Sequence, residues 1–221
     1  MKIILDPQIL ENFCYDFINR LSKYQLSYYL RDKSSGHSKE NAIHASIIWT
    51  REAVCQINTS KTIAGSKELS DLLVLISFID ILLEARDQTY CTIYKEDRYP
   101  EVNEVFCFQD APSLYEELKN RNYFKEIRAL FSAHPLNLRE PTKKPQANRF
   151  ADVPFIGNTA IARLANRKGD FYTRLWTATI KDEDTLYFPL YIDDLIAYAH
   201  LIYNCFYKFQ DRLKQIANRH T

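Results

Sequence analysis

Glycine is scarce in this chain, with only four glycines among 221 residues. Proteins that bind nucleotides through a P-loop or a Rossmann unit place several glycines at the turns that face phosphate. Neither the G-x-x-x-x-G-K-S/T pattern nor the G-x-G-x-x-G pattern is present. The sequence therefore argues against nucleotide binding by either of these routes.

Cysteine is also sparse, and its spacing carries no metal-site or disulfide pattern. The five cysteines are odd in number and include no C-x-x-C pair: Cys14, Cys55, Cys91, Cys107 and Cys205. Zinc sites and disulfide frameworks both need closely spaced or even-numbered cysteines. We expect reduced thiols packed as small apolar groups. No cluster of His, Asp and Glu has metal-ligand spacing either, so we expect no metal and no cofactor.

Long apolar runs and an excess of charge are missing as well. The longest apolar run, residues 72–83, is interrupted by Ser77 and Asp80 and is too short to span a bilayer. The N-terminus reaches Pro7 and then charged residues too early for a signal peptide. With 29 basic and 28 acidic residues, no global field draws the chain to nucleic acid or membrane. We expect a cytoplasmic protein without membrane contact.

Aromatic and helix-forming residues are plentiful. The chain has 13 phenylalanines and 15 tyrosines, and 46% of its residues are apolar, which suffices for a folded core. Apolar residues recur at helical spacing in about five segments, near residues 6–31, 39–57, 69–94, 110–134 and 193–219. The third segment is apolar all round, which is typical of a helix at the centre of a bundle. Asp80 within it should have a partner, either structural or catalytic.

The region after residue 134 changes in composition. Four prolines predict a loop from Pro135 to about Phe155, with a short helix possible over residues 159–166. Residues 171–177 and 185–191 are rich in Tyr, Phe, Trp and Thr and predict a β-hairpin. We therefore predict a mainly α fold, a helical bundle of about five long helices with one small β-hairpin insertion. It would be a single domain over residues 1–221, with the helical core at 1–135 and 192–219 and the insertion at 136–191.

The segment Arg128-Ala-Leu-Phe-Ser-Ala-His134 contains the residues best suited to chemistry. Arginine can hold two phosphate oxygens, and histidine can give or take a proton near neutral pH. At about 100° per residue the two side chains would lie roughly 120° apart on a continuous helix, so they would not face each other. Pro135 should end the helix and redirect His134. Ser132, four residues after Arg128, shares its face. A pair splayed in this way also fits a composite site between two chains.

This segment resembles the Arg-(four to six residues)-His motif of the HEPN superfamily, and the predicted helical core is similar to that family's bundle. The residue after the arginine, which is often polar in active members, is Ala129. The resemblance implies a metal-independent endoribonuclease in toxin–antitoxin or anti-phage defence, acting on RNA as a homodimer. Arg128 would then stabilise phosphate, and His134 would be the acid and base.

Two other hypotheses remain open. The second hypothesis is a non-catalytic helical module of the same ancestry that binds a protein partner or a ligand. Alternatively, the basic stretch with Lys143, Lys144 and Arg149 could contact nucleic-acid phosphate, either as the substrate-binding part of the ribonuclease or in a binding subunit without activity.

Overall fold

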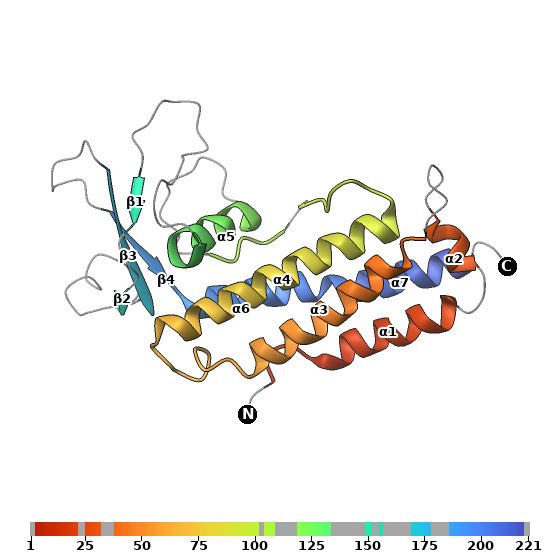
Figure 1. The fold of residues 1–221 in the computed structure, drawn as a ribbon, viewed down its shortest axis with the longest axis horizontal. Coiled ribbons are helices and arrows are strands. Elements are labelled where there is room, and N and C mark those ends of the chain that lie inside the picture. The colour runs from red at the N-terminus through yellow and green to blue at the C-terminus, as the bar shows by residue number, and fades with distance from the viewer. Residues whose placement is uncertain are drawn as a thin grey trace. The chain divides into compact units, whose positions relative to one another are not determined.

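The computed structural model describes residues 3–21, 25–31, 38–101, 104–108, 119–133, 149–151, 155–156, 169–177 and 186–218. These residues are mainly helical (Figure 1). The α-helices are α1 (Pro7–Leu21), α2 (Gln25–Leu30), α3 (Glu40–Asn58), α4 (Leu69–Tyr94), α5 (Asn120–Arg128), α6 (Ile192–Tyr203) and α7 (Cys205–Asn218). A π-helix, η1 (Ala129–Ala133), follows α5 directly. The strands are β1 (Arg149–Ala151), β2 (Phe155–Ile156), β3 (Phe171–Thr177) and β4 (Leu186–Leu190).

The chain divides into two compact units, which are described separately. Unit 1 comprises Met1–Thr59, Phe78–Val102 and Ala199–Thr221, and unit 2 comprises Ser60–Ser77 and Asn103–Tyr198. The helices α4 and α6 each contribute residues to both units. No helix of the described residues is both long and apolar enough to cross a membrane.

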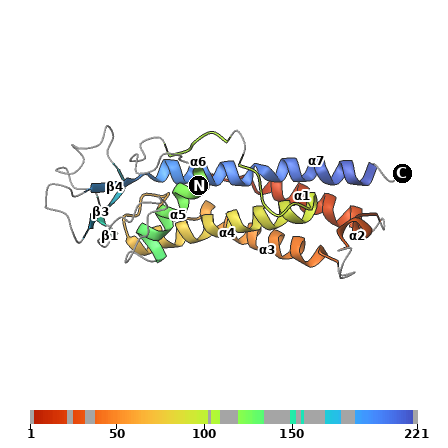
Figure 2. The same cartoon turned by 90° about the horizontal axis from the view of Figure 1, so that it is seen from above.

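Unit 1 is a bundle in which α1 lies beside both α3 and α7 (Figures 1 and 2). Its core contains an aromatic cluster between α1 and α7, where the ring of Phe13 lies 5.4 Å from Phe206 and 6.5 Å from Phe209. Edge-to-face contacts of this kind stabilise a core beyond the area they bury. The periodic apolar residues of both helices therefore meet as one layer.

At the start of α1, side chains provide hydrogen-bond partners for backbone groups of the first turn. The helix begins with a proline, which has no N–H group to satisfy. The Asp6 carboxylate accepts a hydrogen bond from the Gln8 N–H at 3.0 Å, as an N-cap does. The Leu10 N–H donates to the buried hydroxyl of Tyr203 at 3.2 Å, and this hydroxyl donates to the Asp6 carbonyl at 2.9 Å. The last turn of α6 thus completes the first turn of α1.

Unit 2 contains a small antiparallel sheet. Strand β3 pairs with β4 on one side, with Thr173 opposite Phe188, and with the short strands β1 and β2 on the other. Pro189, which cannot donate to a ladder, lies in β4, whose described pairing is with β3. The ring of Phe188 lies 5.6 Å from Tyr123 of α5 and 6.1 Å from Phe131 of η1. One face of the hairpin therefore packs on the helical segment that carries Arg128.

The predicted fold class, a helical bundle with a small β-hairpin, is confirmed. The predicted helices 39–57 and 69–94 correspond to α3 and α4, and the hairpin corresponds to β3 and β4. Two predictions concern residues outside the described ones: that the first helix is continuous from residue 7 to about 31, and that a short helix occupies residues 159–166. The single-domain assignment stays a prediction.

Three local predictions were wrong. The last helix is interrupted at Asn204, an exposed residue of low helix propensity, so that α6 and α7 are separate. The predicted loop over 135–155 contains β1, because the edge of β3 offers backbone partners to residues 149–151. The fourth helix is not one α-helix over residues 110–134, because α5 begins at Asn120 after the extended residue Lys119 and changes to π-helix at Ala129.

Candidate functional site

The helix α5, which ends at Arg128, is anchored by a buried asparagine and by aromatic contacts. Asn120 at its start is buried, and its side chain accepts a hydrogen bond from the Cys107 N–H and donates one to the Val105 carbonyl, both at 2.8 Å. Phe124 packs its ring 5.1 Å from that of Tyr198. A side chain projecting from α5 is therefore positioned by a buried amide at one end and by aromatic packing along the helix.

Arg128 is the last α-helical residue before η1. Its side chain is half-buried, whereas its neighbours Ile127, Leu130 and Phe131 are buried. Short π-helical turns inside α-helices often occur at functional sites. A π-helix has more residues per turn than an α-helix, so the angle of about 100° per residue does not apply from Ala129 onward. The angle given for a continuous α-helix therefore does not apply to this segment, and the relation of Arg128 to His134 stays a prediction.

Arg128 also ends a basic stripe that the sequence analysis missed. Arg121, Lys125 and Arg128 follow one another at intervals of four and three residues, so they lie on one face of α5. Lys125 is exposed and the two arginines are half-buried. The signal was present in the sequence as a 4–3 spacing of cations. Three positive charges on one helix face form a local attraction for phosphate that the net charge of the chain conceals.

The other predicted site residues are placed only in part. Ser132 lies in η1, which begins directly after Arg128, and its predicted role stays a prediction. Arg149 is the first residue of β1, and its backbone pairs with Thr177 of β3. His134, Lys143 and Lys144 lie outside the described residues.

Cys107 lies near the start of α5, but its thiol is a poor nucleophile. Burial, with the charges of Glu104 and Asp194 adding to it, raises the pKa of Cys107 to about 11. The thiol is therefore protonated at neutral pH, and a thiol is far less nucleophilic than a thiolate. All five cysteines are free thiols, but the prediction that they are packed as small apolar groups is wrong for Cys55, which is exposed, and Cys205 alone among them is fully buried.

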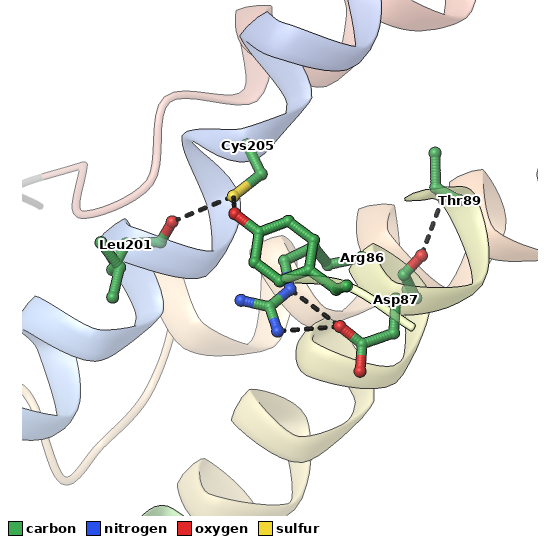
Figure 3. Close-up of polar contacts among 7 residues, drawn as sticks. Arg86, Asp87, Thr89, Leu201 and Cys205 are labelled. Atoms are coloured by element: carbon green, nitrogen blue, oxygen red, sulfur yellow. Dashed lines mark hydrogen bonds and ion pairs between the residues drawn. The ribbon is translucent and has the colours of Figure 1, made fainter. Parts of the chain in front are cut away.

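A buried charged cluster in unit 1 was also missed by the sequence analysis. Arg86 of α4 is 1% exposed, and its Nε and Nη2 donate to the Asp87 carboxylate at 3.0 and 2.8 Å (Figure 3). Its guanidinium carbon lies 3.9 Å from the centre of the Tyr99 ring, whose hydroxyl is 3.2 Å from Cys205 Sγ. This cluster joins α4, the segment after it and α7 within the core. Its burial makes it structural, since a substrate cannot reach it.

The two described histidines lie on helices, His44 exposed on α3 and His200 half-buried on α6. The ring of His44 meets Phe17 edge-on at 5.1 Å, and burial lowers the pKa of His200. Among the residues that the structure describes, no three His, Cys, Asp or Glu side chains gather closely enough to hold a metal ion.

A second candidate surface lies on unit 1, between α3 and α4. A groove of about 580 Å³ is lined by Ala42, Ala45, Ser46, Trp49, Ile81, Glu84, Ala85 and Gln88. Most of these side chains are small or apolar, and Trp49 is 54% exposed. The groove has the character of a binding surface for an apolar group, not of a catalytic site.

Comparison of the chain with protein-family models, curated proteins and solved structures gives no significant match. The residues and their geometry are therefore the basis for inferring function.

Proposed function

We propose that the chain is a metal-independent endoribonuclease of HEPN type, in which Arg128 stabilises the reacting phosphate and His134 transfers protons. The observation that carries the proposal is the basic stripe of α5, which ends at Arg128 where the helix changes to η1. The stripe gives single-stranded RNA a line of phosphate contacts that leads to the Arg128–His134 segment. We place this activity in the cytoplasm and in toxin–antitoxin or anti-phage defence.

The chemistry needs three functions that these residue types supply. A base removes the proton of a ribose 2′-OH, and the oxygen then attacks the adjacent phosphorus. The P–O5′ bond breaks, and an acid protonates the departing 5′-oxygen, which leaves a 2′,3′-cyclic phosphate and a 5′-hydroxyl. A guanidinium neutralises the extra negative charge of the crowded phosphorane. Two copies of the segment, from two chains, would provide an acid and a base together with two arginines.

The fixed backbone around Arg128 supports this role. Electrostatic stabilisation is effective when the charged group is held in place before the reaction begins. The buried residues Ile127, Leu130 and Phe131 anchor the backbone on both sides of Arg128. Ser132 and the basic residues Lys143, Lys144 and Arg149 would contact the RNA outside the reacting phosphate.

The test is RNA cleavage in EDTA by purified wild type and by single variants. We expect Arg128→Ala and His134→Ala to lower kcat by about 10²–10³-fold. Lys125→Ala should raise KM with little change in kcat, because it removes a phosphate contact from the stripe but no group from the reacting phosphate. Lys208→Ala, on the exposed side of α7, is the matched control and should match the wild type.

Cleavage that persists in both Arg128→Ala and His134→Ala would contradict the proposal. So would cleavage that stops in EDTA and returns with added Mg²⁺, because the mechanism uses no metal.

A non-catalytic module that binds a protein partner is the second candidate function. The groove between α3 and α4, with the exposed Trp49 in its wall, favours it. This function predicts no cleavage under any condition, together with a loss of partner binding when the groove is filled by Ala45→Arg.

A further inference from the structure

The groove between α3 and α4 is one half of a longer trough that lies within unit 1 (Figures 1 and 2). A second hollow of about 670 Å³ adjoins the groove, and Ala42 and Gln88 line both of them. Trp49 and Ile81 line only the groove, whereas Lys95 lines only the second hollow. The two helices are therefore antiparallel. The trough follows α4 from Ile81 to Lys95, which is about 21 Å at about 1.5 Å per residue.

The walls of the trough repeat at helical spacing. Four residues of α3 line the groove, from Ala42 to Trp49, and four residues of α4 line it, from Ile81 to Gln88. In both helices these four residues occupy positions i, i+3, i+4 and i+7, which form one helix face. Two such faces side by side offer the ridges and grooves into which the side chains of a third helix pack.

The trough is shallow, and its floor consists of small side chains. Ser46 and Ala85 are 4% and 6% exposed, whereas Trp49 in the wall is 54% exposed. A site for a small molecule usually encloses most of its ligand, and a shallow trough does not. Small side chains at a contact instead let a docked helix approach to about 8 Å between axes, the short end of the usual range.

The apolar end of the trough carries negative charge. Glu84 is exposed, and among the residues that the structure describes its carboxylate has no hydrogen-bond or ion-pair partner. Glu52, exposed one turn beyond Trp49 on α3, adds a second carboxylate at this end. The indole of Trp49 attracts cations as well. This end of the trough is therefore complementary to a lysine or arginine set among apolar residues.

The opposite end of the trough has charges of both signs. The cations Arg31, Lys39 and Lys95 outnumber the carboxylates Glu96 and Asp97 there. An occupant that spans the trough thus meets a negative potential at the Trp49 end and a weakly positive one at the Lys95 end.

We propose that the trough binds an amphipathic helix of a partner protein. The apolar residues of this helix, at positions i, i+3, i+4 and i+7, enter the groove, and a lysine or arginine beside them reaches Glu84. The proposal names the partner of the second candidate function and rests on that function for protein binding alone. It neither requires nor excludes cleavage of RNA.

The probe is a synthetic helical peptide of about 18 residues, slightly longer than the trough. It has leucines along one stripe, with lysines beside them in its last turns and glutamates in its first turn. The chain has two tryptophans, so a Trp176→Phe background leaves Trp49 as the sole indole. We expect its emission to move to shorter wavelength as the peptide saturates, because the peptide covers the ring. A peptide with the lysines and glutamates exchanged should bind about fivefold more weakly.

Substitutions in the trough separate its shape from its charge. Ala45→Arg fills the groove and should raise the Kd of the lysine peptide at least about 30-fold. Glu84→Lys should reverse the preference, so that the charge-exchanged peptide binds more tightly than the lysine peptide. Tyr207→Arg, which places an arginine at an exposed position of α7, is the matched control and should bind as the unsubstituted chain does.

Several results would overturn the proposal. These are no emission change with the peptide, equal binding by Ala45→Arg, or an unchanged preference in Glu84→Lys. An emission change with protein concentration alone would assign the trough to a second copy of the chain. A change with decanoate or single-stranded RNA, but not with the peptide, would assign it to an apolar anion or to nucleic acid. Each of these assignments excludes the helix.

The two proposals fail separately. Cleavage of RNA by the wild type without peptide binding would refute the helix in the trough and leave the ribonuclease intact. Peptide binding that obeys the substitutions, with no cleavage by the wild type, would refute the ribonuclease and leave the trough as the binding site.

Discussion

The hydroxyl of Tyr203 makes two hydrogen bonds between segments almost 200 residues apart in sequence. It accepts from the Leu10 N–H at 3.2 Å and donates to the Asp6 carbonyl at 2.9 Å, and the ring is buried. We predict that Tyr203→Phe, which removes only this oxygen, destabilises unit 1. The Leu10 N–H donates to this hydroxyl, so the substitution removes its acceptor and leaves a buried donor unsatisfied.

The magnitude follows from the two bonds. Each lost hydrogen bond costs about 1 kcal/mol net, and a donor left buried without a partner costs about 1–3 kcal/mol. We expect a total loss of about 2–3 kcal/mol in the free energy of unfolding. For a chain of this length that corresponds to a fall of about 4–12 °C in Tm. Urea unfolding followed by circular dichroism measures the first quantity, and calorimetry measures the second.

The control is Tyr207→Phe, which removes the same oxygen from an exposed ring one turn later. It should change the free energy of unfolding by less than about 0.5 kcal/mol. If Tyr203→Phe is equally mild, water or a shifted backbone replaces the lost bonds, and the account of the α1 start is wrong.

The same hydroxyl gives a pH dependence with a definite sign. Burial raises the pKa of Tyr203 well above its usual value of 10.0, while the hydrogen bond from the Leu10 N–H acts in the opposite direction. The folded state therefore holds this proton more tightly than the unfolded state does. The resulting stability is complete below pH 10 and is lost as the pH rises above it. Between neutral pH and about pH 11, the free energy of unfolding should therefore fall less for Tyr203→Phe than for the wild type. Urea unfolding at the two pH values measures this difference.

Three further predictions concern buried groups in both units. Arg86→Met should lower the free energy of unfolding by about 3–5 kcal/mol, because it removes the ion pair of the partly buried Asp87 carboxylate. Arg51→Ala, which breaks an exposed ion pair, should lower it by less than about 1 kcal/mol. Urea unfolding measures both values. Asn120→Ala should cost about 2–3 kcal/mol through two lost backbone contacts, and Asn122→Ala, at an exposed position of the same helix, should be neutral. Cys107 should react with iodoacetamide at pH 8 far more slowly than a free thiol, since its pKa is raised to about 11, and mass spectrometry of the labelled peptide measures the rate; rapid labelling would contradict that shift.

Much of the helical architecture could be predicted from periodicity and capping residues. Asp6 before Pro7 marked the start of α1, and the apolar run after Leu69 marked α4 over its full length. These signals are local, because an apolar stripe or a cap is set by residues within one or two turns. The hairpin was predictable for the same reason, from its β-branched and aromatic residues.

Features set by distant partners could not be predicted. Strand β1 forms because β3 offers it an edge, and its three residues have no pattern of their own. The burial of Arg86 depends on Tyr99, which packs over the guanidinium from a later segment. The change to π-helix at Ala129 likewise has no local signature, so α-helical spacing does not hold over Ala129–Ala133, while the roles of Arg128 and His134 stay predictions.

Unit 1 is built from three stretches of chain separated by the parts that form unit 2. During synthesis, α1 emerges from the ribosome about 170 residues before α6 and α7, which is roughly 9–34 s at about 5–20 residues per second. Throughout this delay the Phe13 ring lacks Phe206 and Phe209 and the Leu10 N–H lacks its acceptor. The nascent chain therefore carries an open aromatic surface for many seconds. We expect its yield in cells to depend on chaperones that bind such segments, and to fall when translation slows after α3.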